Sequence, residues 1–183
     1  MKKFFHDYSY SIVKLFVNQF AIAIFGVALF VPTFVNLDTL CLIASIFSIL
    51  FYLFLIYMPM WEIGAKDRIA VDVGKKPYRP HLGLLISLCA NIPNLILAVI
   101  ALFFDPFKLV ATLIQGMYWG VISKIGILSF LNDLGITYFL IIIPALLTCW
   151  LAYYLGFKNF KISSIFISDK KEKKKEEAPK IKK

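Results

Sequence analysis

Four long apolar segments constrain this chain more than any other feature of its sequence. The 183 residues are 60% hydrophobic, whereas soluble domains contain about 45–50% apolar residues. A helix of about 20 apolar residues, rising about 1.5 Å per residue, crosses a hydrocarbon core of about 30 Å. Backbone polar groups find no partner in lipid, and these segments lack the alternation of barrel strands. We therefore expect an all-α, polytopic membrane protein with four transmembrane helices in a bundle, at about 15–35, 39–60, 82–104 and 136–157.

The three cysteines do not form a metal or disulfide motif. Cys41, Cys89 and Cys149 each lie within an apolar segment, and no pair has CxxC spacing. Zinc sites and disulfide frameworks need clustered cysteines, so the sequence predicts neither a metal site nor a cofactor. The first apolar segment follows Lys2 and Lys3 and lacks a cleavage region after it, which indicates an uncleaved first span.

Basic residues are concentrated in three parts of the chain. Of the 20 Lys and Arg residues, only Lys108 and Lys124 lie outside the N-terminal segment, the stretch 61–81 and the tail after span four. Cytoplasmic segments carry an excess of Lys and Arg. The sequence therefore predicts a multi-pass protein of the cell (cytoplasmic) membrane with N- and C-termini both cytoplasmic. Residues 163–183, rich in Lys and Glu, are predicted to be a disordered tail after a transmembrane domain at 1–162.

Residues 107–131 are long enough for a fifth span, but a fifth crossing would put the basic tail outside. Polar and small residues recur in this segment at spacings of three and four, and so share one helical face. Such an amphipathic interfacial helix would lie on the outer surface between helices 3 and 4, with rings at headgroup depth and lysines in water. The alternative is a re-entrant hairpin, because glycines permit close packing or a bend. The polar face consists of Lys108, Thr112, Gln115, Gly116, Gly120, Ser123 and Lys124.

Small or weakly polar residues form a stripe along each predicted span. Lipid supplies no hydrophobic force between helices, so small residues and interhelical hydrogen bonds hold a membrane bundle together. The stripes therefore predict the inward faces of the four helices. They are Asn18, Ile22, Gly26 and Thr33; Cys41, Ser45, Ser48 and Tyr52; Ser87, Asn91, Asn94, Ala98 and Ala101; and Ala145, Cys149, Ala152 and Gly156.

Span three also contains a candidate substrate site. Asn91 and Asn94 share a face close to mid-membrane, and Pro93 leaves the carbonyl of Cys89 without its helical donor. Pro144 interrupts span four at similar depth, and paired interruptions are typical of transporter sites. The alternative interpretation is packing, because Asn amides link helices and Pro is tolerated as a kink. Packing is favoured, since no ionisable residue lies deep in any predicted span.

The polar stretch 61–81 interrupts the apolar pattern and carries five basic residues. Pro77 and Pro80 exclude a helix through its second half and turn the chain back toward the membrane. Anionic headgroups attract clustered cations at about 1 kcal/mol each. Asp67 lies between two of the cations, so we expect a local ion pair. The predicted headgroup contacts are Lys66, Arg68, Lys75, Lys76 and Arg79.

The same stretch is a poor candidate for an active site. Its titratable groups match no metal motif, and it offers no Ser or Cys as a nucleophile. No catalytic residue is predicted. A membrane enzyme is the third hypothesis, and it would depend on Glu62, Asp67, Asp72 and His81.

The motif WEIGAKDR at 61–68, followed by ANIPN at 90–94, resembles a pattern in an uncharacterised family of small four-span bacterial integral membrane proteins. The resemblance implies a bacterial membrane protein and carries no known activity. The residues themselves favour a non-enzymatic accessory or interaction subunit, with a membrane-protein partner or as a homo-oligomer in a bilayer with anionic headgroups. The alternative is a small oligomeric transporter or channel that uses Asn91, Pro93 and Asn94. No nucleic-acid partner is expected, because aromatic stacking groups do not accompany the lysines of the tail.

Overall fold

The computed structural model describes residues 2–28, 38–126, 130–131 and 135–160, and these residues contain helices but no strand. The predicted disordered tail, 163–183, lies outside the described residues. In chain order the elements are α1 (Lys2–Ala28), α2 (Asp38–Asp72), α3 (Leu82–Phe103), α4 (Asp105–Ile114), the 3-10 turn η2 (Gly116–Tyr118), α5 (Trp119–Lys124), α7 (Thr137–Leu140) and α8 (Ile142–Phe157).

Three helical segments within the described residues are long and apolar enough to cross a membrane. They are Thr39–Asp72, Leu82–Phe103 and Thr137–Phe157, and they correspond to the second, third and fourth predicted spans. The first predicted span lies partly in α1 and partly in 29–37, outside the described residues. The structure therefore supports the membrane class, and the first of the four predicted spans stays a prediction.

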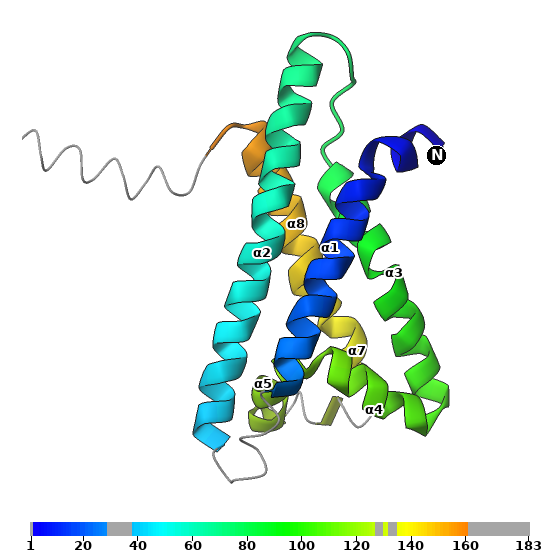
Figure 1. Ribbon diagram of the computed structural model, residues 1–183, viewed down its shortest axis with the longest axis vertical. Coiled ribbons are helices and arrows are strands. Elements are labelled where there is room, and N and C mark those ends of the chain that lie inside the picture. Colours follow the sequence, from blue (N-terminus) through cyan, green and yellow to red (C-terminus); the bar gives the residue numbers. More distant parts are fainter. Residues whose placement is uncertain (1, 29–37, 127–129, 132–134, 161–183) are drawn as a thin grey trace, which may run out of the picture.

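The long helices run side by side along the long axis of the molecule (Figure 1). Helix α2 packs on α8, α8 packs on α3, and α1 contacts both α2 and α3. Helices α4 and α5 lie across one end of this bundle, which we call the capped end. At the opposite end, the polar end, α1 begins, α2 ends, α3 begins and α8 ends.

The predicted inward faces of spans two, three and four are confirmed. Every residue of these three stripes is buried. They are Cys41, Ser45, Ser48 and Tyr52 in α2; Ser87, Asn91, Asn94, Ala98 and Ala101 in α3; and Ala145, Cys149, Ala152 and Gly156 in α8. In the first stripe Ile22 is buried and Asn18 is half-buried, whereas Gly26 and Thr33 have no described side-chain environment. Small residues thus bring the helices together as expected for packing in lipid.

Two glycines allow the backbones of α2 and α8 to meet near the polar end. A Cβ atom on Gly156 would press on the carbonyl of Trp61 and would lie 2.9 Å from its carbon atom. A Cβ atom on Gly64 would press in the same way on the carbonyl of Tyr153, and would lie 2.9 Å from the backbone nitrogen of Phe157. Each helix therefore presents a glycine to the backbone of the other, and neither position has room for a side chain.

Helix α2 continues to Asp72 through the first half of the polar stretch, beyond the end at residue 60 predicted for the second span. Its 35 residues rise by about 52 Å, more than the roughly 30 Å hydrocarbon core. It ends in a Schellman turn, in which Lys75 N–H donates to the Ala70 carbonyl at 2.8 Å and Gly74 N–H donates to the Val71 carbonyl at 2.9 Å. Gly74 has a φ of +74°, which favours glycine.

Prolines inside the spans leave backbone carbonyls that other groups can use. Pro59 lies within α2 and removes the helical donor to the Leu55 carbonyl. The amide of Asn18 on α1 donates to that carbonyl, at a long 3.5 Å, and so links the two helices. Pro144 has a larger effect, because span four is divided at Ile141 into α7 and α8.

The segment 107–131 does not form one continuous amphipathic helix. It breaks at Gln115, and its small and polar face is turned partly inward, with Gln115, Gly116 and Gly120 buried. Gly120 N–H donates to the hydroxyl of Ser45 on α2 at 2.8 Å. Leucine and phenylalanine side chains of α4, such as Leu109, are exposed instead. Gly120 meets the backbone of α2, while Lys124 of the same face is exposed. The interfacial helix and its alternative, the re-entrant hairpin, both stay predictions.

Candidate functional site

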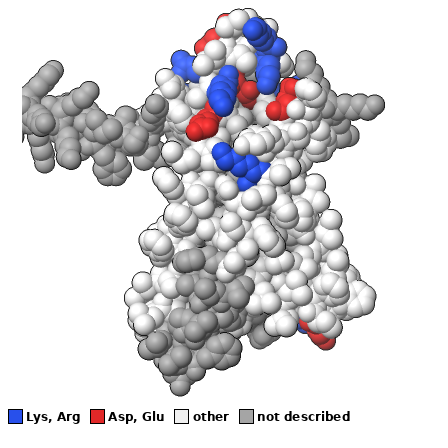
Figure 2. Space-filling view, in the orientation of Figure 1, with Lys and Arg blue, Asp and Glu red and all other residues white. Residues whose placement is uncertain are grey.

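Charged side chains gather at the polar end of the molecule. Figure 2 shows acidic and basic residues over the end of α2, and a largely uncharged face between that end and a small charged spot at the opposite end. The sequence explains this distribution, because 82–104 and 135–157 contain no Asp, Glu, Lys or Arg. At the capped end the described charges include Asp105 and Lys108, which pair with each other at 2.8 Å.

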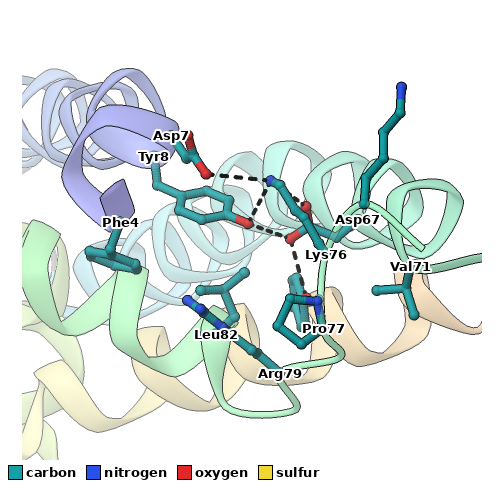
Figure 3. A pocket seen from close by; sticks show the side chains of 11 residues that line it. Phe4, Asp7, Tyr8, Asp67, Val71, Lys76, Pro77, Arg79 and Leu82 are labelled. Carbon is teal, nitrogen blue, oxygen red and sulfur yellow. Dashed lines mark hydrogen bonds and ion pairs between the residues drawn. The ribbon is translucent and has the colours of Figure 1, made fainter. Parts of the chain in front are cut away.

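One carboxylate, that of Asp67, joins several elements at the polar end (Figure 3). Its Oδ2 atom accepts hydrogen bonds from the Tyr8 hydroxyl at 2.7 Å and from the Tyr153 hydroxyl at 3.3 Å. Its Oδ1 atom accepts from Lys76 Nζ at 3.2 Å. Lys76 Nζ also donates to the Tyr8 hydroxyl at 3.2 Å and lies 3.8 Å from Asp7 Oδ2. We call these five residues the Asp67 cluster.

The Asp67 cluster draws on four parts of the chain. Asp7 and Tyr8 come from α1, Asp67 from α2, Lys76 from the connection to α3, and Tyr153 from α8. The Schellman turn at Gly74 reverses the chain, and this reversal carries Lys76 back to Asp67 nine residues earlier. Asp67 is only 6% exposed. A carboxylate buried to this extent needs charged or hydrogen-bonding partners, so the cluster fixes the polar ends of these elements together.

The local ion pair predicted for Asp67 is wrong. Lys66 and Arg68 are its sequence neighbours, but consecutive helical residues point in different directions and do not face each other. Arg68 instead pairs with Asp72, one turn further along α2, at 3.6 Å. Asp67 faces inward and takes Lys76 as its cation.

A cavity of about 150 Å³ opens beside the cluster. This volume is roughly ten times the minimum that holds one water molecule, but it is smaller than the roughly 300 Å³ of the smallest typical drug-sized pockets. The cavity combines carboxylates, phenols, cations and apolar side chains. It is lined by Phe4, Asp7, Tyr8, Asp67, Val71, Lys75, Lys76, Pro77, Arg79, Leu82 and Tyr153 (Figure 3).

The phenol of Tyr8 stays protonated well into the alkaline range. Burial raises the pKa of Tyr8 above its ordinary value, and the hydrogen bond to Asp67 and the charges of Asp67 and Asp7 raise it further. The guanidinium of Arg79 acts in the opposite direction and lowers it. Tyr8 is therefore a hydrogen-bond donor in the cluster, and its deprotonation would place a second anion beside Asp67.

This pKa shift predicts an alkaline loss of stability. An unfolded tyrosine ionises near pH 10, whereas Tyr8 in the folded chain keeps its proton to higher pH. The unfolded state then binds fewer protons than the folded state, so the free energy of unfolding falls as pH rises above about 10. Tyr8→Phe should lower stability at pH 8 and give a shallower fall between pH 9 and 11 in detergent unfolding titrations. A Tyr8→Phe profile parallel to that of the wild type would contradict the assignment.

The predicted headgroup contacts occupy different positions at the polar end. Lys75, Lys76 and Arg79 line the cavity, and Lys76 is committed to the Asp67 cluster. Lys66 is exposed and Arg68 pairs with Asp72, and neither lines the cavity. The structure thus divides the five cations into three around one pocket and two elsewhere on α2. Their contact with lipid remains a prediction.

The predicted mid-membrane site is present as a buried pair on one helix. Asn91 donates to the carbonyl of Ser87 at 2.9 Å, and Asn94 donates to Asn91 Oδ1 at 3.1 Å. Both amides lie within α3, which continues through Pro93. Both hydrogen bonds lie within α3, so the two amides hold each other in place. A role of Asn91 and Asn94 in transport stays a prediction.

The four residues of the enzyme hypothesis do not come together around the cavity. Of these four, only Asp67 lines it. Glu62 and Asp72 are exposed on α2, and His81 is exposed at the start of α3, where its side chain makes no capping bond. Within the described residues, no group of three or more His, Cys, Asp and Glu side chains could hold a metal ion.

Aromatic residues near the polar end make specific contacts within the chain. Tyr8 and Tyr153 are buried in the Asp67 cluster. Trp61 donates its Nε1–H to the Phe160 carbonyl at 2.8 Å, and Lys158 lies over the ring of Tyr154 at 4.8 Å. The hydrogen bonds of the two tyrosines to Asp67 join residues far apart in the sequence, and no sequence motif indicates them.

Comparison with protein-family models, with curated proteins and with solved structures gives no match for this chain.

Proposed function

We propose that the chain is a multi-pass protein of the bacterial cytoplasmic membrane and acts without catalysis, as an accessory or interaction subunit. Its N terminus, the connection 73–81 and its C-terminal tail face the cytoplasm. The observation that carries the proposal is the separation of charge along the bundle. Most cations of the described residues lie at the polar end, where the Asp67 cluster forms, and long uncharged helices lead away from it.

The orientation follows from the distribution of cations. The polar end carries the five basic residues of 61–81 and Lys158, while the capped end carries Lys108 and Lys124. Cations near the ends of spans are retained in the cytoplasm. The resemblance of 61–94 to small bacterial membrane proteins supports the same assignment.

An interaction role is supported by a pronounced apolar surface on α2. Phe47 and Phe51 stack on each other with centroids 6.3 Å apart, and both are exposed together with Phe54. On the face of α2 that packs against the rest of the chain, Ser45 and Ser48 are buried. A bilayer or a partner helix must cover these rings, and aromatic side chains contribute large contact areas to either.

Purification of the tagged, full-length protein from its native membrane in a mild detergent tests this proposal. Mass spectrometry and mass determination should show a second protein in stoichiometric amount, and the Asp67 cluster should be intact in that complex. A homo-oligomer without any second protein would contradict a role as a subunit of a larger assembly.

A small transporter or channel is the second candidate, and two observations favour it. Span four is interrupted between α7 and α8, near Pro144. Inside the described residues, Gln115 Oε1 and the Tyr118 hydroxyl are buried without a hydrogen-bond partner, and buried polar atoms usually have one. For this function, Asn91→Leu should abolish flux in liposomes while the protein stays folded. Unchanged flux in that variant would contradict a site at Asn91.

A further inference from the structure

Two cations at the cavity are left without a carboxylate. Within the described residues, Asp7 and Asp67 both pair with Lys76, whereas neither Lys75 nor Arg79 has an ion pair. Arg79 nevertheless lies close enough to the cluster to lower the pKa of Tyr8. Figure 3 shows the side chain of Arg79 beside Leu82. The lining carries two carboxylates, Asp7 and Asp67, and three cations, Lys75, Lys76 and Arg79, so its formal net charge is 3 − 2 = +1.

The start of α3 adds to this positive character. Leu82, the first residue of α3, lines the cavity, and the helix has no acidic residue in its first turn. The N-terminus of a helix carries partial positive charge and unsatisfied N–H groups. His81 makes no capping bond with its side chain. The field of α3 and the charge of Arg79 thus favour an anion at the same place.

The lining also has an apolar half. Phe4, Val71, Pro77 and Leu82 contribute hydrocarbon, and Leu82 and Tyr153 are almost completely buried. The cavity is too small for a nucleotide-sized ligand but large enough for a phosphate group with a few attached atoms. Phosphate is the anion that a planar guanidinium binds through two parallel hydrogen bonds.

We propose that this cavity binds a phosphate group, with Arg79 as its principal ligand and Lys75 as a second cation. Lys76 stays in the Asp67 cluster and holds the wall of the site in place. The phosphate belongs either to the headgroup of an anionic phospholipid or to a small soluble phosphate ester. The inference rests on the proposed placement of the polar end at the cytoplasmic face, where both sources are present.

The site can be tested on the purified full-length protein, without any partner. Delipidated protein in a zwitterionic detergent is titrated with phosphatidylglycerol, and bound lipid is counted by native mass spectrometry. Inorganic phosphate and glycerol 3-phosphate are added in parallel as soluble competitors. Binding of phosphatidylglycerol that these competitors do not displace identifies a lipid, and saturable binding of glycerol 3-phosphate by itself identifies a soluble ester.

Two matched variants decide whether Arg79 is the ligand. Arg79→Gln should weaken the affinity for the phosphate compound at least ten-fold. Arg68→Gln removes the same charge from α2 outside the cavity, and its affinity should stay within two-fold of the wild type. Lys75→Gln, at an exposed position, provides a second test if Arg79→Gln does not fold. Equal losses in the Arg79 and Arg68 variants, or no saturable binding of any phosphate compound, would overturn the proposal. Neither result depends on whether a protein partner co-purifies.

Discussion

Replacing Gly156 with leucine should prevent α8 from packing on α2 and leave little folded protein. A Cβ atom at this position would press on the backbone carbonyl of Trp61, and the next atoms of Trp61 lie within 3.0 Å. Overpacking costs about 1–3 kcal/mol where side chains can move. Here the obstacle is the backbone of a long helix, so we expect a loss of more than about 3 kcal/mol in the free energy of unfolding. Such a loss is a large part of the total stability of a typical domain.

Unfolding titrations in mixed detergent measure this effect, and the chain provides a matched control. Gly126 has no atom within 4 Å of an added Cβ, and its φ is not positive. Gly126→Leu should therefore fold with a stability close to that of the wild type. Gly64→Leu should resemble Gly156→Leu, because it meets the Tyr153 carbonyl at the same interface. Wild-type stability in both interface variants would show that α2 and α8 do not meet at these glycines.

Replacing Asp67 with asparagine should produce the second large effect. The carboxylate accepts three hydrogen bonds, two from tyrosines and one from Lys76, and it is 6% exposed. Hydrogen bonds to charged groups contribute about 1.5–3 kcal/mol each, and removing one partner of a buried pair leaves the other uncompensated. Lys76 remains partly exposed and can turn to water. We therefore expect a loss of about 2–3 kcal/mol in the free energy of unfolding.

Asp72→Asn is the control for this variant. Asp72 lies on the same helix and pairs with Arg68, but both side chains are well exposed. Exposed pairs contribute about 0–1 kcal/mol, so Asp72→Asn should change stability by less than about 0.5 kcal/mol. Equal effects of the two substitutions would mean that Asp67 is not the buried centre of the polar end.

The inward faces of the helices could be predicted from the sequence, because packing in lipid depends on small side chains at helical spacing. Ser45, Ser87 and Ala152 mark these faces directly, and all three are buried. The interruption near Pro144 could be predicted for the same reason, since a missing N–H is a local property of the chain. The geometry of 107–131 could not be predicted from the sequence, because the burial of Gly116 and Gly120 depends on contact with α2.

The Asp67 cluster was missed for a different reason. Tyr8 and Tyr153 lie 59 and 86 residues from Asp67, and sequence spacing cannot show that they meet. One signal was available. Met60, Gly64, Asp67 and Val71 follow one another at spacings of four, three and four, which extends the inward stripe of α2 beyond the membrane. Applied past Trp61, the same periodicity would have predicted both the longer helix and an inward-facing carboxylate.

The central claim is that the polar end faces the cytoplasm and the capped end lies across the membrane from it. Single cysteines test it in a chain whose native Cys41, Cys89 and Cys149 are alanine. Val73→Cys probes an exposed position at the polar end, and Asp105→Cys probes an exposed position at the capped end. With a membrane-impermeant maleimide, Asp105→Cys should be labelled in intact cells and Val73→Cys only after permeabilisation. Labelling of Val73→Cys from outside intact cells would contradict the account.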